Sequence, residues 1–260
     1  MYITRGGIRL AYEEAGAGVP VLLLHGFPFS RQMWRLQAPL GRTVRLITCD
    51  LRGFGESEGT PSAMDEFAED VHALVTHLGL STFVLGGFSM GGYVLFRYLA
   101  RHADRVQALL LLDTRADADS AEGRQRRYDA IARIEREGPS GYLDDFVKLV
   151  VSPKTLQSRP DLIRDLRDRM AKVRPATLTG ALRAMAERPD STSLLPTIRL
   201  PTLIVVGEDD KATPPDSARG MHAAIAGSRF VLIPEAGHVS NLEQPEPFNA
   251  ALESFLRALQ

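Results

Sequence analysis

Short, uninterrupted apolar runs recur along this 260-residue chain, separated by segments with helical periodicity. The runs are VPVLLL (19–24), VRLITC (44–49), TFVLGG (82–87), VQALLLL (106–112), PTLIVVG (201–207) and RFVLIP (229–234). Such runs are typical of strands in a parallel sheet that is buried on both faces. Between them lie helical stripes, such as that of Phe67, Val71 and Leu78. The pattern predicts an α/β fold with a mostly parallel central sheet and helices on both faces.

The two ends of this alternation and its one interruption define the expected domains. The opening YITRGGIRLAYEEAG alternates around Gly6-Gly7, which predicts a β-hairpin. Between residues 115 and 196 the sequence is helical, heavily charged and without a strand signal. We interpret 115–196 as a helical cap inserted into a core formed by 1–114 and 197–260; surface helices of one domain are the alternative. Acids match the arginines of this segment, so we expect them on a solvated face.

Charge and cysteine content exclude several classes of partner. Thirty-one basic residues nearly cancel thirty-two acidic ones, so no net field attracts nucleic acid or an anionic membrane. The single cysteine, Cys49, rules out an intrachain disulfide and suits a reducing compartment. The N-terminus lacks the apolar core of a signal peptide, and the apolar runs are too short to span a bilayer. A cytoplasmic protein without nucleic-acid or membrane partners is expected.

The pentapeptide GFSMG carries the strongest chemical signal. Ser89 directly follows the expected strand 82–87 and precedes an expected helix over 90–101. A one-residue strand-to-helix turn forces a positive φ, which costs roughly 1–3 kcal/mol and persists where function requires it. Gly87 and Gly91 remove Cβ atoms that would collide across the turn. This context predicts a Gly-x-Ser-x-Gly nucleophile elbow, with the hydroxyl beside the helix N-terminus; a structural turn serine is the alternative.

A serine nucleophile needs a base, and histidine is the usual choice. Four histidines lie in or at the end of expected helices, where we expect them to face solvent: His72, His77, His102 and His222. His25 follows the strand at 19–24, and we interpret it as shaping that loop. His238 lies between the last expected strand and the last helix, on the edge where carboxyl ends of parallel strands meet. We predict that His238 is the base; a loop-packing role is the alternative.

The base in turn needs a carboxylate that fixes its tautomer and stabilises the imidazolium. The segment GEDDKATPP ends one strand with Glu208, Asp209 and Asp210. The segment LLLDT ends another strand with Asp113. All four acids lie between Ser89 and His238 in the chain, so the order Ser–Asp–His holds for each aspartate.

An oxyanion hole is the fourth element that such a site requires. The N–H of Met90, directly after the serine, is one expected donor. The second is expected from the loop LHGFP after the strand at 19–24. There Gly26 lets the backbone approach, and Phe27 offers its N–H.

Five segments in this order resemble the motifs of the α/β-hydrolase superfamily, over nearly the whole chain: HGFPFSRQMW, DLRGFGES, GFSMGGYV, GEDDKATPP and GHVSNLEQPEPF. LDTRADADSAEGRQRR and MAERPDST are similar to a group of bacterial carboxylesterases that also resemble 3-oxoadipate enol-lactonases. The resemblance implies the α/β-hydrolase fold. In that family pattern the acid is the aspartate three residues after the strand-ending glycine, which maps from Gly207 to Asp210.

The resemblance also implies an activity. A serine carboxylesterase would hydrolyse short- to medium-chain esters through an acyl-serine on Ser89, with His238 relaying the proton and Asp210 orienting His238. The N–H groups of Phe27 and Met90 would hold the oxyanion. The expected substrates are a small-molecule ester and water. No cofactor or metal is expected, because neither a His-Glu-x-x-His motif nor cysteine-rich ligand spacing occurs.

Two other functions remain open on the sequence. An enol-lactonase or a C–C bond hydrolase would use the same triad, and its carboxylate-bearing substrate would call for an arginine facing Ser89. A non-catalytic member that binds a small ligand would keep the fold without needing the triad.

Overall fold

A mixed sheet with the order β1-β2-β4-β3-β5-β6-β7-β8 forms the centre of the computed structural model, which describes residues 1–259. Its strands are β1 (Tyr2–Arg5), β2 (Ile8–Ala15), β3 (Pro20–Leu24), β4 (Arg45–Cys49), β5 (Phe83–Phe88), β6 (Val106–Leu112), β7 (Thr202–Gly207) and β8 (Arg229–Ile233). Strands β3 to β8 pair in parallel, and β5 and β7 are buried along their whole length. The apolar runs of the sequence therefore correspond to the parallel strands, as predicted.

The predicted hairpin forms the antiparallel edge of the sheet. Strand β1 pairs with β2 across Gly6 and Gly7, whose φ angles of 56° and 79° are the left-handed values that glycine adopts readily. Strand β2 then joins β4 antiparallel, with Tyr12 opposite Cys49. The hairpin thus extends the parallel sheet by two strands.

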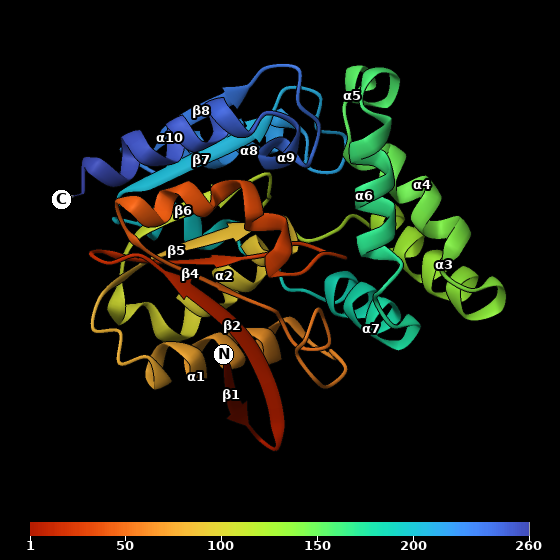
Figure 1. Cartoon of the computed structure of the whole chain (residues 1–260), viewed down its shortest axis with the longest axis horizontal. Helices are drawn as coiled ribbons and strands as arrows, with labels where there is room; N and C mark the ends of the chain where they lie inside the picture. The colour runs from red at the N-terminus through yellow and green to blue at the C-terminus, as the bar shows by residue number, and fades with distance from the viewer. Residues whose placement is uncertain (260) are drawn as a thin grey trace.

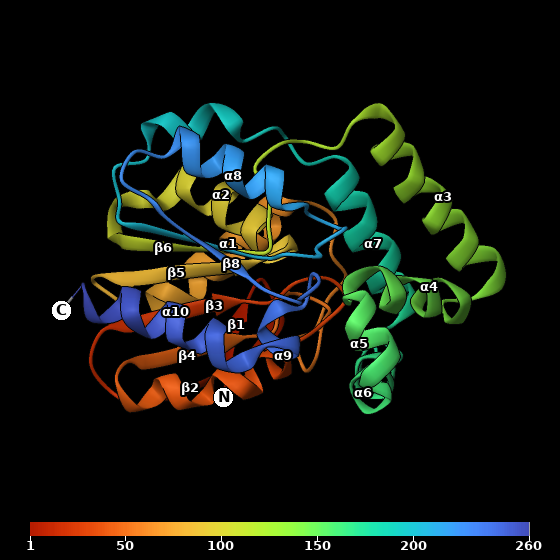
Figure 2. The same cartoon turned by 90° about the horizontal axis from the view of Figure 1, so that it is seen from above.

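Helices cover both faces of the sheet (Figures 1 and 2). One layer consists of α1 (Met64–His77), α2 (Met90–His102) and α8 (Pro215–Ala224); the other contains the 3-10 helix η1 (Arg31–Arg42), α9 (Ser240–Glu243) and α10 (Pro245–Arg257). A short 3-10 turn, η2 (Ala103–Arg105), leads into β6. These two layers explain why the central strands have no polar face.

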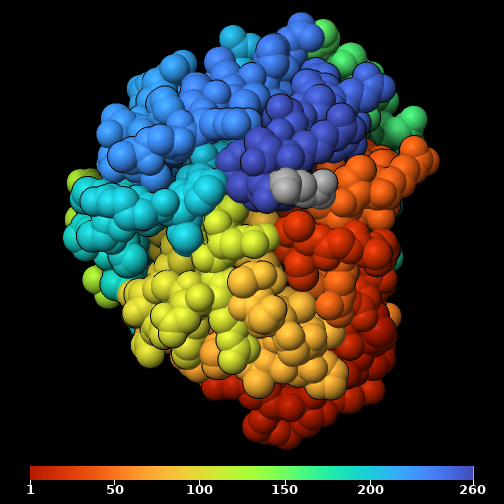
Figure 3. Space-filling model, turned by 90° about the vertical axis from the view of Figure 1, so that its left-hand side faces the viewer, coloured from red at the N-terminus to blue at the C-terminus, as the bar shows by residue number. Residues whose placement is uncertain are grey.

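The chain between β6 and β7 is helical, as predicted. It forms α3 (Ala121–Glu137), α4 (Ser140–Val150), α5 (Pro153–Ser158), α6 (Pro160–Met170), α7 (Pro175–Ala186) and the 3-10 helix η3 (Thr192–Thr197). Helices α3 to α7 gather at the end of the sheet toward which the parallel strands point (Figures 1 and 2). The opposite end of the molecule is covered by core segments, with only a margin of these helices visible behind it (Figure 3).

Among residues 1–259 no helix combines the length and the apolar character needed to cross a membrane.

The prolines at the N-termini of α5, α6 and α7 explain how the helical segment between β6 and β7 is divided. Proline fits the first turn of a helix, where its missing N–H has no intrahelical acceptor, but it interrupts a preceding one.

Candidate active site

Ser89 occupies a one-residue turn between β5 and α2. Its φ of 51° and ψ of −116° are unusual for a residue with a side chain. A Cβ on Gly87 would lie 2.4 Å from the carbonyl oxygen of Gly91. A Cβ on Gly91 would lie 2.4 Å from the carbonyl oxygen of Leu24 at the end of β3. The two elbow glycines therefore permit both the turn and its close contact with the neighbouring strand, and the predicted positive φ is confirmed.

Three side chains from distant parts of the chain form one hydrogen-bonded line. His238 Nε2 lies 2.8 Å from Ser89 Oγ, and His238 Nδ1 lies 2.8 Å from Asp210 Oδ2. Ser89 is partly exposed, whereas His238 and Asp210 are buried. The Asp210 carboxylate thus lies within hydrogen-bond distance of His238 Nδ1. In this arrangement, an Nδ1–H that donates to Asp210 leaves Nε2 free to accept the serine proton.

Asp210 is fixed by its own loop. Its Oδ1 accepts hydrogen bonds from the N–H groups of Ala212 and Thr213, at 2.8 and 2.9 Å. The Thr213 hydroxyl donates to Asp210 Oδ2 at 2.7 Å and lies 3.2 Å from His238 Nδ1. Sequence reasoning did not identify Thr213. The available signal was the three-residue spacing between Asp210 and Thr213. An aspartate side chain often accepts hydrogen bonds from the backbone N–H groups two and three residues later, and such a turn brings the third residue next to the carboxylate.

Among the described residues, the hydrogen-bond partners of the His238 ring nitrogens are Asp210, Thr213 and Ser89, and Asp113, the rival acid, is not one of them. Its Oδ1 accepts from the Gly207 N–H at 2.8 Å, and its Oδ2 lies 2.5 Å from Ser240 Oγ. The two hydrogen bonds of Asp113 thus connect the end of β7 to the start of α9, two residues after His238. Its side chain is fully buried, and this burial, together with the charge of Asp210, raises the pKa of Asp113 well above its usual range.

We expect Asp113→Asn to be at least as stable as the wild type at neutral pH. The amide can accept from Gly207 N–H and donate to Ser240 Oγ, and it carries no titratable group. Because the folded pKa of Asp113 is raised, its contribution to stability is full below about pH 4 and is lost as the pH rises through the folded pKa. The Tm of the variant should therefore rise relative to the wild type between pH 4 and pH 8, measured by calorimetry. A variant that loses stability relative to the wild type over that range would contradict this assignment.

The loop after β3 lies against Ser89. A Cβ on Gly26 would lie 3.0 Å from Ser89 Cβ and 2.6 Å from the Phe88 ring, so only glycine fits there without displacement. This brings Phe27 next to the elbow. Met90 is the first residue of α2, where backbone N–H groups have no intrahelical acceptor. His25 shapes this loop as predicted: Nε2 accepts from the Leu51 N–H at 2.9 Å, and Nδ1 lies 2.9 Å from the Gly26 oxygen.

Aromatic side chains of α4 cover the same loop. The Phe27 ring packs edge-on against Tyr142 and Phe146, with ring centroids 6.4 and 5.6 Å apart. Side chains from residues 115–196 therefore pack against the loop that lies beside Ser89. The contact is apolar on the side of Phe27, which suits an alkyl or acyl group.

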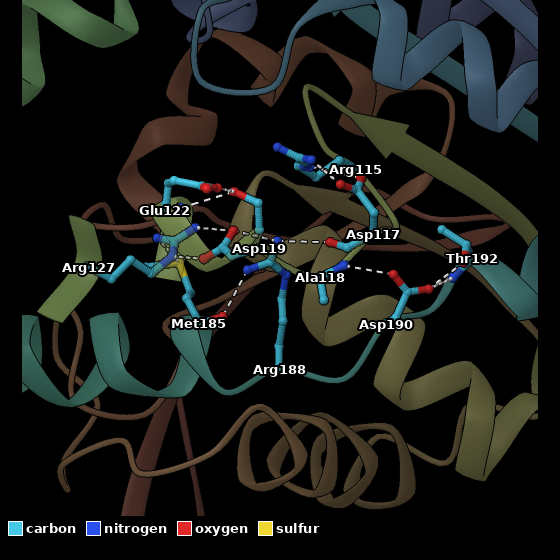
Figure 4. A network of polar contacts seen from close by, with 12 residues as sticks. Arg115, Asp117, Ala118, Asp119, Glu122, Arg127, Met185, Arg188, Asp190 and Thr192 are labelled. Carbon is cyan, nitrogen blue, oxygen red and sulfur yellow. Dashed lines mark hydrogen bonds and ion pairs between the residues drawn. The ribbon is translucent and has the colours of Figure 1, made fainter. Parts of the chain in front are cut away.

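A buried network joins the two stems of the 115–196 segment (Figure 4). Asp119 accepts from Arg127 and, at 2.9 Å, from Arg188. Arg188 also donates to the backbone carbonyl oxygen of Asp117 at 2.9 Å. Its guanidinium group lies over the Tyr93 ring of α2, 4.2 Å from the ring centroid. Burial would raise the pKa of Asp119, but the hydrogen bonds from Arg127 and Arg188 outweigh it and lower the pKa to about 2.

The arginines of this segment were expected on a solvated face, and for Arg188 this expectation is wrong. Its side chain is 3% exposed, because the Asp119 carboxylate, backbone carbonyls and the Tyr93 ring replace water around the guanidinium. Arg127 is also largely withdrawn from solvent, whereas Arg124 and Arg126 are exposed as expected. Sequence charge balance cannot separate these cases, since it does not say which acid meets which base.

Comparison with known proteins shows the family of the chain. Residues 19–245 match the profile of a family that is described as alpha/beta hydrolase fold. The chain belongs to this family. An AB hydrolase superfamily protein of Bacillus subtilis is 31% identical over 268 residues, covering 97% of each chain.

Two solved structures have the same fold as this chain. A thermophilic esterase from Thermogutta terrifontis is 42% identical, with a TM-score of 0.93 over 99% of this chain and 96% of that one. The enol-lactonase from Burkholderia xenovorans LB400 is 26% identical, with a TM-score of 0.90 over 99% of this chain and all of that one (100%). As an α/β-hydrolase, the chain thus has both an esterase and a lactonase among its relatives.

Within residues 1–259, no group of three or more His, Cys, Asp or Glu side chains has a geometry that could hold a metal ion.

Proposed function

We propose that the protein is a serine carboxylesterase that hydrolyses short- to medium-chain carboxylic esters through an acyl-serine intermediate. The observation that carries the proposal is the continuous line from Ser89 Oγ through His238 to Asp210, at 2.8 Å on each side of the imidazole. The positive φ of Ser89 at the elbow and the similarity to the Thermogutta esterase support the same function.

The geometry suits a two-stage acyl transfer. Ser89 Oγ attacks the ester carbonyl while His238 Nε2 accepts its proton, and Asp210 stabilises the imidazolium. The Phe27 and Met90 N–H groups stabilise the negative charge on the carbonyl oxygen. His238 then gives its proton to the leaving alcohol as the C–O bond breaks. Water attacks the acyl-serine with His238 again as base, which releases the acid and restores Ser89.

Residues 115–196 form, in this proposal, a helical cap on a core of residues 1–114 and 197–260. Its position at the carboxyl ends of the strands and the contact of Tyr142 and Phe146 with Phe27 support the division. The cap would enclose the acyl or alcohol group of the substrate. No cofactor or metal enters the proposed chemistry, and the proposed partners are a small ester and water in a cytoplasmic setting.

An enol-lactonase acting on the same triad is the second candidate. The similarity to the Burkholderia enol-lactonase favours it, as do Arg127 and Arg188, two arginines of the proposed cap that are withdrawn from solvent. Both guanidinium groups already share Asp119, which reduces their attraction for a substrate carboxylate. The ester is therefore the preferred substrate class; a C–C bond hydrolase or a non-catalytic ligand-binding protein has less support.

A panel of p-nitrophenyl esters, enol-lactones and dicarboxylate substrates tests this choice. We expect activity on short- and medium-chain esters with a shallow length preference. Each buried methylene gains about 0.8 kcal/mol, so kcat/KM should change by less than about fourfold per added carbon. A steep optimum at long-chain triglycerides would contradict the enclosed site, and activity on lactones alone would favour the second candidate.

A further inference from the structure

A buried carboxylate joins the loop of His238 to the junction between α4 and α5. Glu243 ends α9 and is 3% exposed. Its Oε2 accepts a hydrogen bond from the Gly237 N–H at 2.6 Å, and its Oε1 accepts one from the Ser152 N–H at 2.8 Å. Gly237 directly precedes His238, whereas Ser152 caps the N-terminus of α5. One side chain therefore holds the backbone of the histidine loop and that of the cap together.

The two backbones are also in direct contact. A Cβ on Gly237 would lie 2.6 Å from the Ser152 nitrogen. The Val239 N–H donates to the Val150 oxygen at 3.1 Å. Residues on both sides of His238 thus meet residues 150–152. The imidazole is held in a loop whose flanks rest on the cap.

The core holds the other side of the same loop. A Cβ on Gly207, at the end of β7, would lie 2.1 Å from the Gly237 oxygen. On the cap side, Arg159, just before α6, donates to the Glu243 backbone oxygen at 2.9 Å. The loop is therefore enclosed between β7 and the cap, and any displacement of residues 150–152 would be transmitted to it.

We propose that Glu243 is a positioning residue for His238, which makes the α4–α5 junction part of the support of the catalytic base. The inference rests on the proposed function. Each carboxylate oxygen of Glu243 accepts from one of the two converging N–H donors, and leaving either donor unpaired in a buried site is costly. A misplacement of about 1 Å in a catalytic group can cost about 10²-fold in rate. The effect of Glu243 should therefore appear in kcat.

Glu243→Gln tests the proposal in the full-length protein. Its amide offers one oxygen, so its NH₂ group faces the other backbone N–H and one bond is lost. We expect kcat for p-nitrophenyl acetate to fall roughly 10- to 100-fold with KM within about twofold of the wild type. Glu246→Gln is the matched control, because Glu246 is exposed on α10 and undergoes the same change of charge; its kinetics should be unchanged. Assays are run at a temperature where circular dichroism shows each variant fully folded.

Glu243→Asp provides a second variant should the glutamine protein fail to fold. It keeps the carboxylate but is one methylene shorter, so it cannot reach both N–H groups, and the same split between kcat and KM is expected. Either variant, folded and with wild-type kcat, would overturn the proposal.

Hydrogen exchange gives a readout that does not depend on activity. Peptides covering 150–155 and 236–240 should both lose protection in Glu243→Gln and keep it in Glu246→Gln. A wild type that hydrolyses no ester would contradict the proposed function, while exchange would still decide the coupling. Equal protection of both peptides in Glu243→Gln and wild type would overturn the inference even if the wild type is an active esterase.

Discussion

Replacing Ser89 with alanine is expected to lower kcat for ester hydrolysis by about 10⁴- to 10⁶-fold. The variant loses the hydroxyl oxygen that lies 2.8 Å from His238 Nε2, so no acyl-enzyme can form at the elbow. The rest of the site should remain, because the turn is built by backbone contacts around Gly87 and Gly91. Initial rates with p-nitrophenyl acetate measure the effect.

Ser81→Ala is the matched control for this variant. Ser81 is exposed just before β5, at the opposite end of the strand that leads to Ser89. Its replacement should leave kcat unchanged. A Ser89→Ala protein that is folded and retains a tenth of the wild-type rate would show that the elbow serine is not the nucleophile.

Asp210→Asn is expected to lower kcat by roughly 10³- to 10⁴-fold. The amide fits the same space, but its NH₂ group can pair with an unprotonated Nδ1 and so stabilise the tautomer whose proton lies on Nε2. That tautomer cannot accept the proton of Ser89. Steady-state kinetics on the purified variant measure the loss, with circular dichroism as the check on folding.

Two neighbouring acids provide comparison variants for Asp210. Asp209→Asn changes the adjacent residue, and Asp113→Asn changes the acid at the end of β6; each should cost far less than Asp210→Asn. The reverse pattern, an inactive Asp113→Asn and an active Asp210→Asn, would move the acid to the earlier strand.

The parts of the fold that follow from local physics could be predicted from sequence. The parallel strands are continuous apolar runs, because a strand covered on both faces has no place for polar side chains. The elbow could be predicted because a serine between a strand and a helix, with glycines two residues away on each side, leaves few other conformations. The approach of the loop after β3 to Ser89 followed from its position and from Gly26, where a Cβ would lie 3.0 Å from Ser89 Cβ. That this loop supplies an oxyanion donor stays a prediction.

The parts that depend on long-range pairing could not be predicted. Nothing in the sequence near Glu243 indicates that its carboxylate meets Ser152, ninety-one residues earlier. Arg188 looked like other charged residues of its helical segment until its acid and its aromatic partner were known. Asp113 and Asp210 both end buried strands, and residue-level reasoning left both open until the family pattern favoured Asp210. Their hydrogen-bond partners distinguish them in the structure.

Labelling with an organophosphate tests the central claim most directly. Diethyl p-nitrophenyl phosphate reacts with a serine that is activated by a neighbouring base, releases p-nitrophenol and leaves a stable phosphoryl group. Intact mass and peptide mapping should show one diethylphosphoryl group per chain, on Ser89, with loss of esterase activity in proportion to labelling. Ser89→Ala should take up none. Labelling at another serine, or full activity in protein labelled at Ser89, would contradict the assignment of Ser89 as the nucleophile.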